Sequence, residues 1–289
     1  AGCMAIPLLL ACGSEGDADD GGGSDTGGTS GGGGSSGRGG SGGSGNGGST
    51  AKGGSGGGFA CTSDASPGEL VEVPAGEFIM GCNEDVDSEC APDELPTHTV
   101  SLSAFSIERT EVTQDQYAAC VTEGACDPPS CEWDCERTDY PAGCINLGQA
   151  QTYCEWAGRR LPTEAEWEKA ARGEDGAKFP WGNEEADCTL VNMSGCEDDA
   201  AAVGSFPDGA SPYGALDMAG NMVEMVSDWY DETYYADSPS ENPTGPAAGT
   251  RYTGRGGGWR SLSVWQRASK RDWYDPADSG TSLGFRCVL

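Results

Sequence analysis

The sequence predicts an α+β fold for residues 61–289, built from short strands, three helices and much irregular chain. Three observations support this prediction. Short apolar segments bounded by turn residues precede residue 108, and three helix-start signals follow between residues 113 and 173. The third observation is an even set of 12 cysteines after residue 60, which is typical of a disulfide framework in an exported protein. These 229 residues suffice for one large domain or two small ones.

The strand signals are short. We expect strands at 70–73 and 77–80, on either side of the turn formed by residues 74–76. Residues 98–107 alternate moderately between apolar and polar side chains, so a further strand is expected there.

Each expected helix has a capping residue. Thr113 with Gln116, and Thr163 with Glu166, form capping boxes, and Asn146 can cap the helix between them. A glycine ends the second and the third helix. After residue 180 the chain is rich in Gly, Pro, Asn, Asp and Trp and has little helical periodicity, so bridges or bound ions are expected to order it.

Cysteine spacing leaves most pairings open. Two pairs bracket short acidic loops, which makes local bridges plausible: Cys82 with Cys90, and Cys188 with Cys196. Five further cysteines lie between residues 120 and 144 in a loop-rich patch. The alternative is a zinc site, which the lack of a Cys-x2-Cys pair disfavours; its ligands would be Cys126, Cys131 and Cys135.

The first twelve residues are typical of the end of a secretory signal peptide. Their last four, 9–12, resemble a bacterial lipobox, in which Cys12 becomes the lipidated N-terminus. The alternative is a signal peptide that happens to contain a cysteine. Gly13 follows where an inner-membrane retention signal would place Asp, so we expect export and lipid anchoring in the cell envelope, at the outer membrane.

Residues 13–60 contain 24 glycines and 9 serines, with almost no apolar side chains to offset the entropy of ordering them. A flexible coil of this length has an end-to-end distance of roughly 35–40 Å. We therefore expect a disordered tether between the anchor and the domain at 61–289.

Charge and histidine content exclude several classes of function. The 47 acidic and 16 basic side chains give a net charge of -31, which argues against a nucleic-acid or anionic-membrane binder. The only histidine, His98, excludes a multi-histidine metal site and leaves at most one Ser-His or Cys-His pair. No apolar run approaches the roughly 20 residues that span a bilayer.

Several segments, in order along the chain, resemble the formylglycine-generating enzyme (sulfatase-modifying factor) family. They are residues 76–81, 111–117, 153–168, 179–182, 213–221, 255–257 and 283–287. The resemblance covers residues 68–289. It implies one compact domain, distantly C-type-lectin-like, with little regular secondary structure, calcium as a brace and a disulfide between Cys154 and Cys287.

The family's founding activity oxidises a cysteine of a client sulfatase to formylglycine, using oxygen and a copper ion held by two cysteine thiolates. By resemblance, Ser261 stands at the first cysteine position and Gln266 at or near the second, while Gly258 replaces a serine. A hydroxyl and an amide cannot bind copper(I) as thiolates do. We therefore expect a non-catalytic binding module without copper. The alternatives are an oxidase with another metal arrangement and a structural envelope protein.

Calcium ligands can be carried over by position. The family's second calcium site corresponds to Asp217, Gly220, Met222 and Glu224, and its first site to Asn192 and Met193. Carboxylates and free carbonyls in an irregular loop are the ligands that calcium prefers. The alternative is that these residues are solvated loop side chains.

The family's peptide groove corresponds to a basic, tryptophan-rich segment. Residues 251–273 hold six arginines and lysines against one acid. Such side chains suit a peptide or an anionic ligand; the candidate groove residues are Arg260, Trp265, Arg267, Arg271 and Trp273. The alternative is that the basic groups pair internally with the acidic loops. We expect a monomer.

Overall fold

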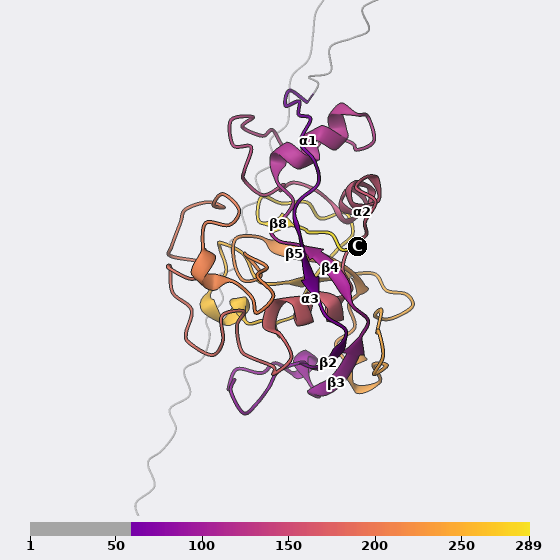
Figure 1. Ribbon diagram of the computed structural model, residues 1–289, viewed down its shortest axis with the longest axis vertical. Coiled ribbons are helices and arrows are strands. Elements are labelled where there is room, and N and C mark those ends of the chain that lie inside the picture. Colours follow the sequence, from indigo (N-terminus) through magenta and orange to yellow (C-terminus); the bar gives the residue numbers. More distant parts are fainter. Residues whose placement is uncertain (1–58) are drawn as a thin grey trace, which may run out of the picture. The chain divides into compact units, whose positions relative to one another are not determined.

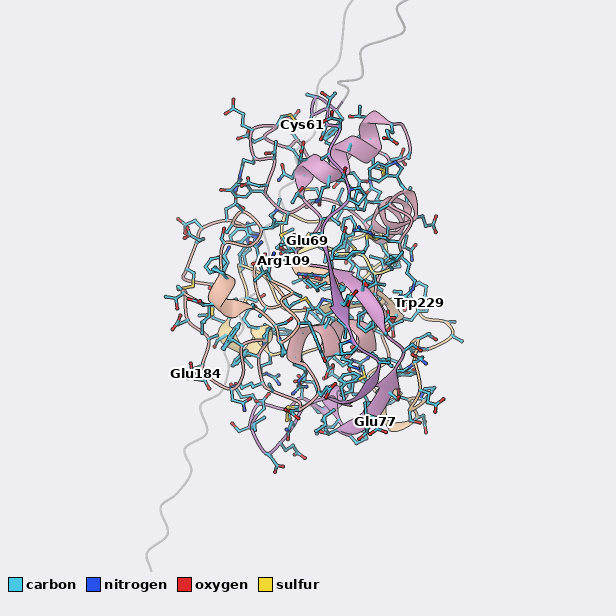
Figure 2. All side chains as sticks on the ribbon, viewed as in Figure 1. Cys61, Glu69, Glu77, Arg109, Glu184 and Trp229 are labelled. Atoms are coloured by element: carbon cyan, nitrogen blue, oxygen red, sulfur yellow. A yellow bond between two sulfur atoms is a disulfide. The ribbon has the colours of Figure 1, made fainter. Side chains whose placement is uncertain are left out.

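A computed structural model describes residues 59–289 (Figure 1). The predicted signal-peptide remnant, the lipidation site at Cys12 and nearly all of the predicted tether lie outside the described residues. Within 59–289, no helix combines the length and the apolar character needed to cross a membrane. Acidic side chains such as Glu77 and Glu184 project from the surface (Figure 2).

The first four strands form two antiparallel pairs, one nested within the other along the chain. They are β1 (Leu70–Val73), β2 (Gly76–Met80), β3 (His98–Leu102) and β4 (Phe105–Glu108). Strand β1 pairs with β4, and β2 pairs with β3. The expectation of one strand over 98–107 is therefore corrected to two strands in separate sheets. The chain breaks between them because the backbone N–H of Ser103 donates to Oδ1 of Asn242 (2.8 Å) and not to a strand.

All three predicted helices are present, as α1 (Gln114–Thr122), α2 (Leu147–Trp156) and α3 (Glu164–Arg172). Each of the three caps forms a complete capping box, including Asn146, whose backbone N–H is bonded in return by Gln149. Helices α1 and α2 lie toward one end of the domain and the β2–β3 pair toward the other, with α3 near the centre (Figure 1).

A four-stranded sheet orders the irregular C-terminal half. Its strand order is β7 (Asp272–Tyr274), β6 (Tyr252–Arg255), β5 (Val223–Trp229) and β8 (Leu283–Gly284). Only the β5–β8 pairing is parallel. Four short 3-10 helices accompany it in the described chain: η1 (Pro92–Glu94), η2 (Pro207–Gly209), η3 (Tyr234–Ala236) and η4 (Ser263–Gln266).

Two apolar clusters form the core. The first surrounds Trp167 of α3, and the second surrounds Tyr153 of α2 and Phe285 after β8. Every residue of α3 is buried, so its charged side chains must find partners inside the protein. Helix α3 therefore acts as the central support between β2, β5 and β6.

Six disulfides use all 12 cysteines of the described chain. They are Cys61–Cys135, Cys82–Cys90, Cys120–Cys126, Cys131–Cys144, Cys154–Cys287 and Cys188–Cys196. Both predicted local bridges are present, and so is the long-range bridge that the family resemblance implied. The alternative zinc site is wrong, because each of its three cysteines is bonded to another sulfur.

Candidate functional site

The candidate site lies just after β6, where the Arg-Gly-Gly segment turns toward η4. Gly256 and Gly257 both have positive φ, at 84° and 64°. A Cβ atom on Gly257 would lie 2.6 Å from the carbonyl oxygen of Trp265. The glycines therefore allow the turn to pack closely against the segment that contains Gln266.

Gln266 fills the position that the resemblance assigned to a copper-binding cysteine. Its side chain is fully buried, and Nε2 donates to the carbonyl oxygens of Gly258 (3.2 Å) and Ser261 (3.3 Å). The Ser261 hydroxyl in turn accepts a hydrogen bond from the Gly258 backbone N–H (3.1 Å). Gly258, Ser261 and Gln266 are thus joined by hydrogen bonds, two of which come from the side-chain amide of Gln266.

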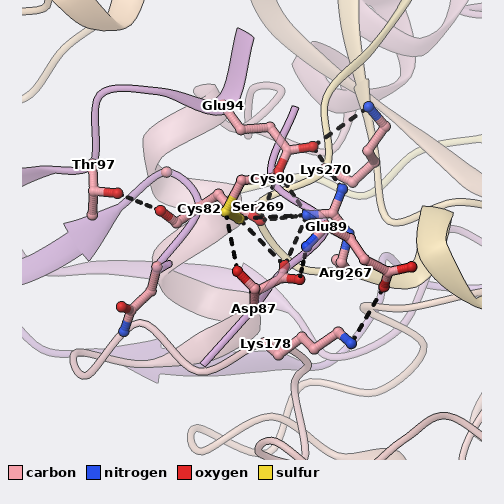
Figure 3. Close-up of a disulfide and its surroundings, with 12 residues drawn as sticks. Cys82, Asp87, Glu89, Cys90, Glu94, Thr97, Lys178, Arg267, Ser269 and Lys270 are labelled. Atoms are coloured by element: carbon pink, nitrogen blue, oxygen red, sulfur yellow. Dashed lines mark hydrogen bonds and ion pairs between the residues drawn. A yellow bond between two sulfur atoms is a disulfide. The ribbon is translucent and has the colours of Figure 1, made fainter. Parts of the chain in front are cut away.

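Arg267 was predicted to line a groove, and the structure corrects this prediction. Its guanidinium is 1% exposed and lies between two carboxylates, with Nη1 at 2.8 Å from Asp87 Oδ2 and at 2.7 Å from Glu94 Oε2 (Figure 3). Its Nε donates to the carbonyl oxygen of Val264 (2.9 Å). Arg267 therefore joins η4 to the loop that precedes η1.

The structure also corrects the prediction that Arg271 lines a groove. It is 2% exposed, and its guanidinium donates to Glu164 from Nε (2.8 Å) and Nη2 (3.0 Å). Arg255 donates to the same carboxylate and to Glu168. Burial alone would raise the pKa of Glu164, but Arg271 and Arg255 hold it below its usual value. Both arginines therefore neutralise buried carboxylates of α3 and are not available to a ligand at the surface.

The other groove candidates are at the surface. Arg260 is exposed and stacks on Trp259, with its guanidinium carbon 4.2 Å from the ring centre. Trp265 is 37% exposed and Trp273 is 43% exposed. Leu262, which the sequence reasoning did not single out, is 63% exposed. The surface part of the site therefore combines exposed apolar side chains with cations, since Lys270 lies over Trp265 (4.8 Å) and Arg251 over Trp273 (3.5 Å).

Most of the basic groups in residues 251–273 have acidic partners. Lys270 Nζ lies 3.4 Å from Glu94, and Arg251 Nε lies 3.5 Å from Asp275. Of the six cations in this segment, Arg260 alone makes no ion pair with another described residue. The alternative of internal pairing thus holds for most of the segment.

The residues proposed for the second calcium site surround a buried acidic cluster. Glu224 and Asp217 are both buried, and so is Glu111, which the sequence reasoning did not propose as a ligand. Glu111 accepts hydrogen bonds from the Asn221 side chain and the Met222 backbone N–H. Burial and the neighbouring carboxylates of Asp217 and Glu224 raise the pKa of Glu111 well above its usual value.

One guanidinium balances these three carboxylates in part. Arg286 is buried and contacts both oxygens of Glu224. Three carboxyl groups thus face one guanidinium, and burial raises the pKa of Asp217 as well as that of Glu111. Gly220 and Met222, the proposed carbonyl ligands, lie in the same loop and are buried.

Asn192, from the first proposed calcium site, has one unsatisfied atom. Its Nδ2 donates to the backbone oxygen of Asp199 (3.0 Å), but its buried Oδ1 has no hydrogen-bond partner. The carbonyl oxygen of the neighbouring Met193 accepts from the Cys196 backbone N–H (3.0 Å). The unsatisfied Asn192 Oδ1 is an oxygen donor that fits a hard cation, whereas the Met193 carbonyl already has a hydrogen-bond partner.

A cavity of about 550 Å³ lies elsewhere, between the β3–β4 connection, α2 and the beginning of α3. Arg160 and Glu166 form a two-point ion pair on its wall, with distances of 2.7 and 2.6 Å. Neither Ser261 nor Gln266 lines this cavity, so it is separate from the candidate site.

Comparison with known proteins now decides the family. Residues 60–289 match the sulfatase-modifying factor enzyme 1-like domain. The chain belongs to the sulfatase-modifying factor family. A formylglycine-generating enzyme from Streptomyces coelicolor is 32% identical over 282 residues, a match that covers 75% of this chain and 88% of that protein.

Other relatives share the domain of the sulfatase-modifying factor family under different names. The serine/threonine-protein kinase pkn1 of Chlamydia pneumoniae is 33% identical over 244 residues, which cover 76% of this chain but only 38% of the kinase-named protein. The structure of PvdO from Pseudomonas aeruginosa is 28% identical, with a TM-score of 0.67, and covers 80% of this chain and 97% of PvdO. The scaffold is therefore shared by proteins with different names.

Proposed function

We propose that this member of the sulfatase-modifying factor family is a non-catalytic binding module, exported and held at the cell envelope by a lipid on Cys12. The observation that supports this most is the Gln266 side chain. Its amide donates to two backbone carbonyls in place of a thiolate, and the neighbouring Ser261 hydroxyl is also hydrogen-bonded.

The donors available in the described chain argue against the family's copper chemistry. Copper(I) prefers soft thiolate ligands, and every cysteine from 61 to 287 is bonded to another sulfur. His98 is the only histidine, its Nδ1 lies 2.9 Å from the Pro96 carbonyl oxygen, and its ring packs against Tyr235. Residues 59–289 therefore contain neither a pair of free thiolates nor a histidine cluster that could bind an oxygen-activating metal.

The exposed surface of residues 260–265 supports a peptide as the ligand. Leu262 and Trp265 offer apolar surface, and Arg260 offers an exposed cation that makes no ion pair with a described residue, although its charge helps to lower the pKa of Asp199. Because the neighbouring basic groups are paired, this surface suits an apolar side chain next to one carboxylate better than a polyanion.

Calcium would brace the loops beneath this surface. The residues fit such an ion, because the buried carboxylates of Glu111, Asp217 and Glu224 outnumber Arg286 and because Asn192 Oδ1 is unsatisfied. Asp217, Glu224, Asn192 and the carbonyls of Gly220, Met222 and Met193 would hold the ions. Bound calcium would supply positive charge and fix the loop backbone, with no part in a reaction.

A peptide-library selection tests the binding role. Peptides enriched on the wild-type domain are expected to combine an apolar residue with an acidic one, and to lose at least tenfold in affinity on the variant Leu262→Ser/Trp265→Ala. Val86→Ser is the matched control, because Val86 is also an exposed apolar residue (39%) but lies in the loop before η1. A library from which no sequence is enriched would favour a structural envelope protein.

A second assay tests the absence of catalysis. The purified domain, copper(I), oxygen and a cysteine-containing sulfatase peptide are incubated together, with the Streptomyces coelicolor relative as the positive control. The peptide mass is expected to remain unchanged with this chain. Formation of the aldehyde would instead support the alternative oxidase.

A further inference from the structure

The Cys82–Cys90 disulfide lies next to the side chain of Arg267, the residue that follows Gln266. Cys82 follows β2, and Cys90 precedes η1. Arg267, the residue after Gln266, places Nη1 3.6 Å from the sulfur of Cys82 (Figure 3). The loop between the two cysteines is thus linked to the candidate site through one guanidinium.

The two sulfur atoms differ in environment. Cys82 is fully buried, whereas Cys90 is half-buried and offers the more accessible sulfur. Asp87 lies between them, with Oδ2 3.3 Å from the Cys82 sulfur and 2.8 Å from Arg267. An incoming thiolate would therefore meet Cys90 first, and the departing Cys82 sulfur would lie beside both the Arg267 guanidinium and the Asp87 carboxylate.

Among the disulfides of residues 59–289, the Cys82–Cys90 bond alone has a sulfur that accepts a hydrogen bond from a cationic side chain. The Cys188–Cys196 bond is the natural comparison, because it also spans 8 residues of sequence. Cys188 is more exposed than Cys82 and Cys90, and an acidic residue adjoins each cysteine of this pair: Asp187 precedes Cys188, and Glu197 follows Cys196. Accessibility by itself would make Cys188–Cys196 the more easily reduced bond.

We propose that Cys82–Cys90 is a thiol–disulfide exchange site for a dithiol. One thiolate of the dithiol attacks the Cys90 sulfur, which forms a mixed disulfide while Cys82 leaves as a thiolate. The second thiol of the dithiol then attacks its own bridged sulfur and releases Cys90. The protein disulfide gains two electrons and two protons, and the dithiol is oxidised to a disulfide.

Arg267 favours this direction of attack. A leaving thiolate departs faster when its negative charge is stabilised, and the guanidinium is already hydrogen-bonded to the Cys82 sulfur. Glu94 holds the guanidinium in place through both of its carboxylate oxygens, at 2.7 and 2.8 Å. Once the bond has opened, the Cys82 thiolate takes up a proton from solvent, and the resulting S–H can donate to Asp87 Oδ2, which lies 3.3 Å from the sulfur.

Timed reduction tests the site on the intact oxidised domain. Samples treated with limiting dithiothreitol are quenched, alkylated and mapped by mass spectrometry. Cys82–Cys90 is expected to open at least fivefold faster than Cys188–Cys196. Equal rates, or faster opening of Cys188–Cys196, would overturn the proposal without any variant.

Two further measurements separate the mechanism from mere accessibility. With glutathione in place of the dithiol, the mixed disulfide is expected on Cys90, and an adduct on Cys82 would contradict the direction of attack. In Arg267→Lys, one ammonium cannot hold Glu94 in two-point contact and also reach the sulfur. Opening of Cys82–Cys90 should slow severalfold while the rate for Cys188–Cys196 stays unchanged; no change at Cys82–Cys90 would remove Arg267 from the mechanism.

Discussion

Arg286 and Glu224 form a two-point ion pair in the centre of the domain, with Nη2–Oε1 at 2.6 Å and Nε–Oε2 at 2.7 Å. The side chains of both residues are no more than 1% exposed. The same guanidinium donates to the backbone oxygens of Glu108 and Leu216. This pair therefore joins β5, the end of β4 and the segment after β8.

Arg286→Gln is expected to lower the free energy of unfolding by about 3–5 kcal/mol, because it leaves the buried carboxylate of Glu224 without its hydrogen-bonded cation. Urea denaturation of the variant and the wild type measures the difference. Arg109→Gln is the control, since Arg109 pairs with Glu69 at the surface and its loss should cost less than about 1 kcal/mol. A loss for Arg286→Gln no larger than that of the control would contradict the assigned role.

Calcium binding should appear as a shift in melting temperature. Chelation is expected to lower it, and calcium at 100 times its Kd should restore about 2.7 kcal/mol of stability. Magnesium should restore less, because it demands near-ideal octahedral geometry. Asp217→Asn should weaken the calcium response. A melting temperature that is the same with chelator, with calcium and in Asp217→Asn would refute the brace.

Local signals predicted the helices well. The caps at Thr113, Asn146 and Thr163 depend on residues three positions apart, so the sequence alone places each helix start. The four-stranded sheet had no such signal. Strand β8 has only two residues, and its pairing with Val223 and Glu224 depends on contacts far apart in the sequence.

The candidate site was also predicted only in part, because several of its contacts join residues far apart in the sequence. The assignment of Ser261 to the first copper position, and of Gln266 at or near the second, depends on the family resemblance and stays a prediction. The burial of Arg267 could not be predicted from the sequence, since its partners Asp87 and Glu94 come from a distant loop. Glu111 begins the segment 111–117 that resembles the family, but only the folded chain brings it close to Asp217.

The long-range disulfide should contribute more stability than a local one. Cys154–Cys287 spans 133 residues and Cys188–Cys196 spans 8. Loop-closure entropy predicts a loss of about 5 kcal/mol for Cys154→Ala/Cys287→Ala and about 2.5 kcal/mol for Cys188→Ala/Cys196→Ala. Urea denaturation under oxidising conditions measures both. Equal losses would show that the entropy of the unfolded chain does not govern these bonds.

The buried carboxyl group of Asp228 should make the stability of the folded protein depend on pH in a direction that is unusual for an aspartate. Its carboxylate is buried at the start of α3, where Oδ2 accepts hydrogen bonds from the Glu164 backbone N–H (3.0 Å) and the Ser227 hydroxyl (3.1 Å). Burial, together with the nearby charge of Glu164, raises the pKa of Asp228 to about 7. The folded protein therefore holds this proton more tightly than the unfolded chain does.

The stabilising contribution of protonated Asp228 is fully present below the unfolded pKa of about 4. It is lost as pH rises toward the folded pKa of about 7. Asp228→Asn keeps a neutral acceptor, so its stability relative to the wild type should rise between pH 4 and pH 8, by on the order of 2–4 kcal/mol. Urea denaturation at each pH measures this. Asp231→Asn is the control. Its stability relative to the wild type should change with pH in the opposite direction, because hydrogen bonds from Thr233 lower the pKa of that exposed carboxyl. A difference between Asp228→Asn and the wild type that stays constant with pH would show that Asp228 is ionised throughout the range.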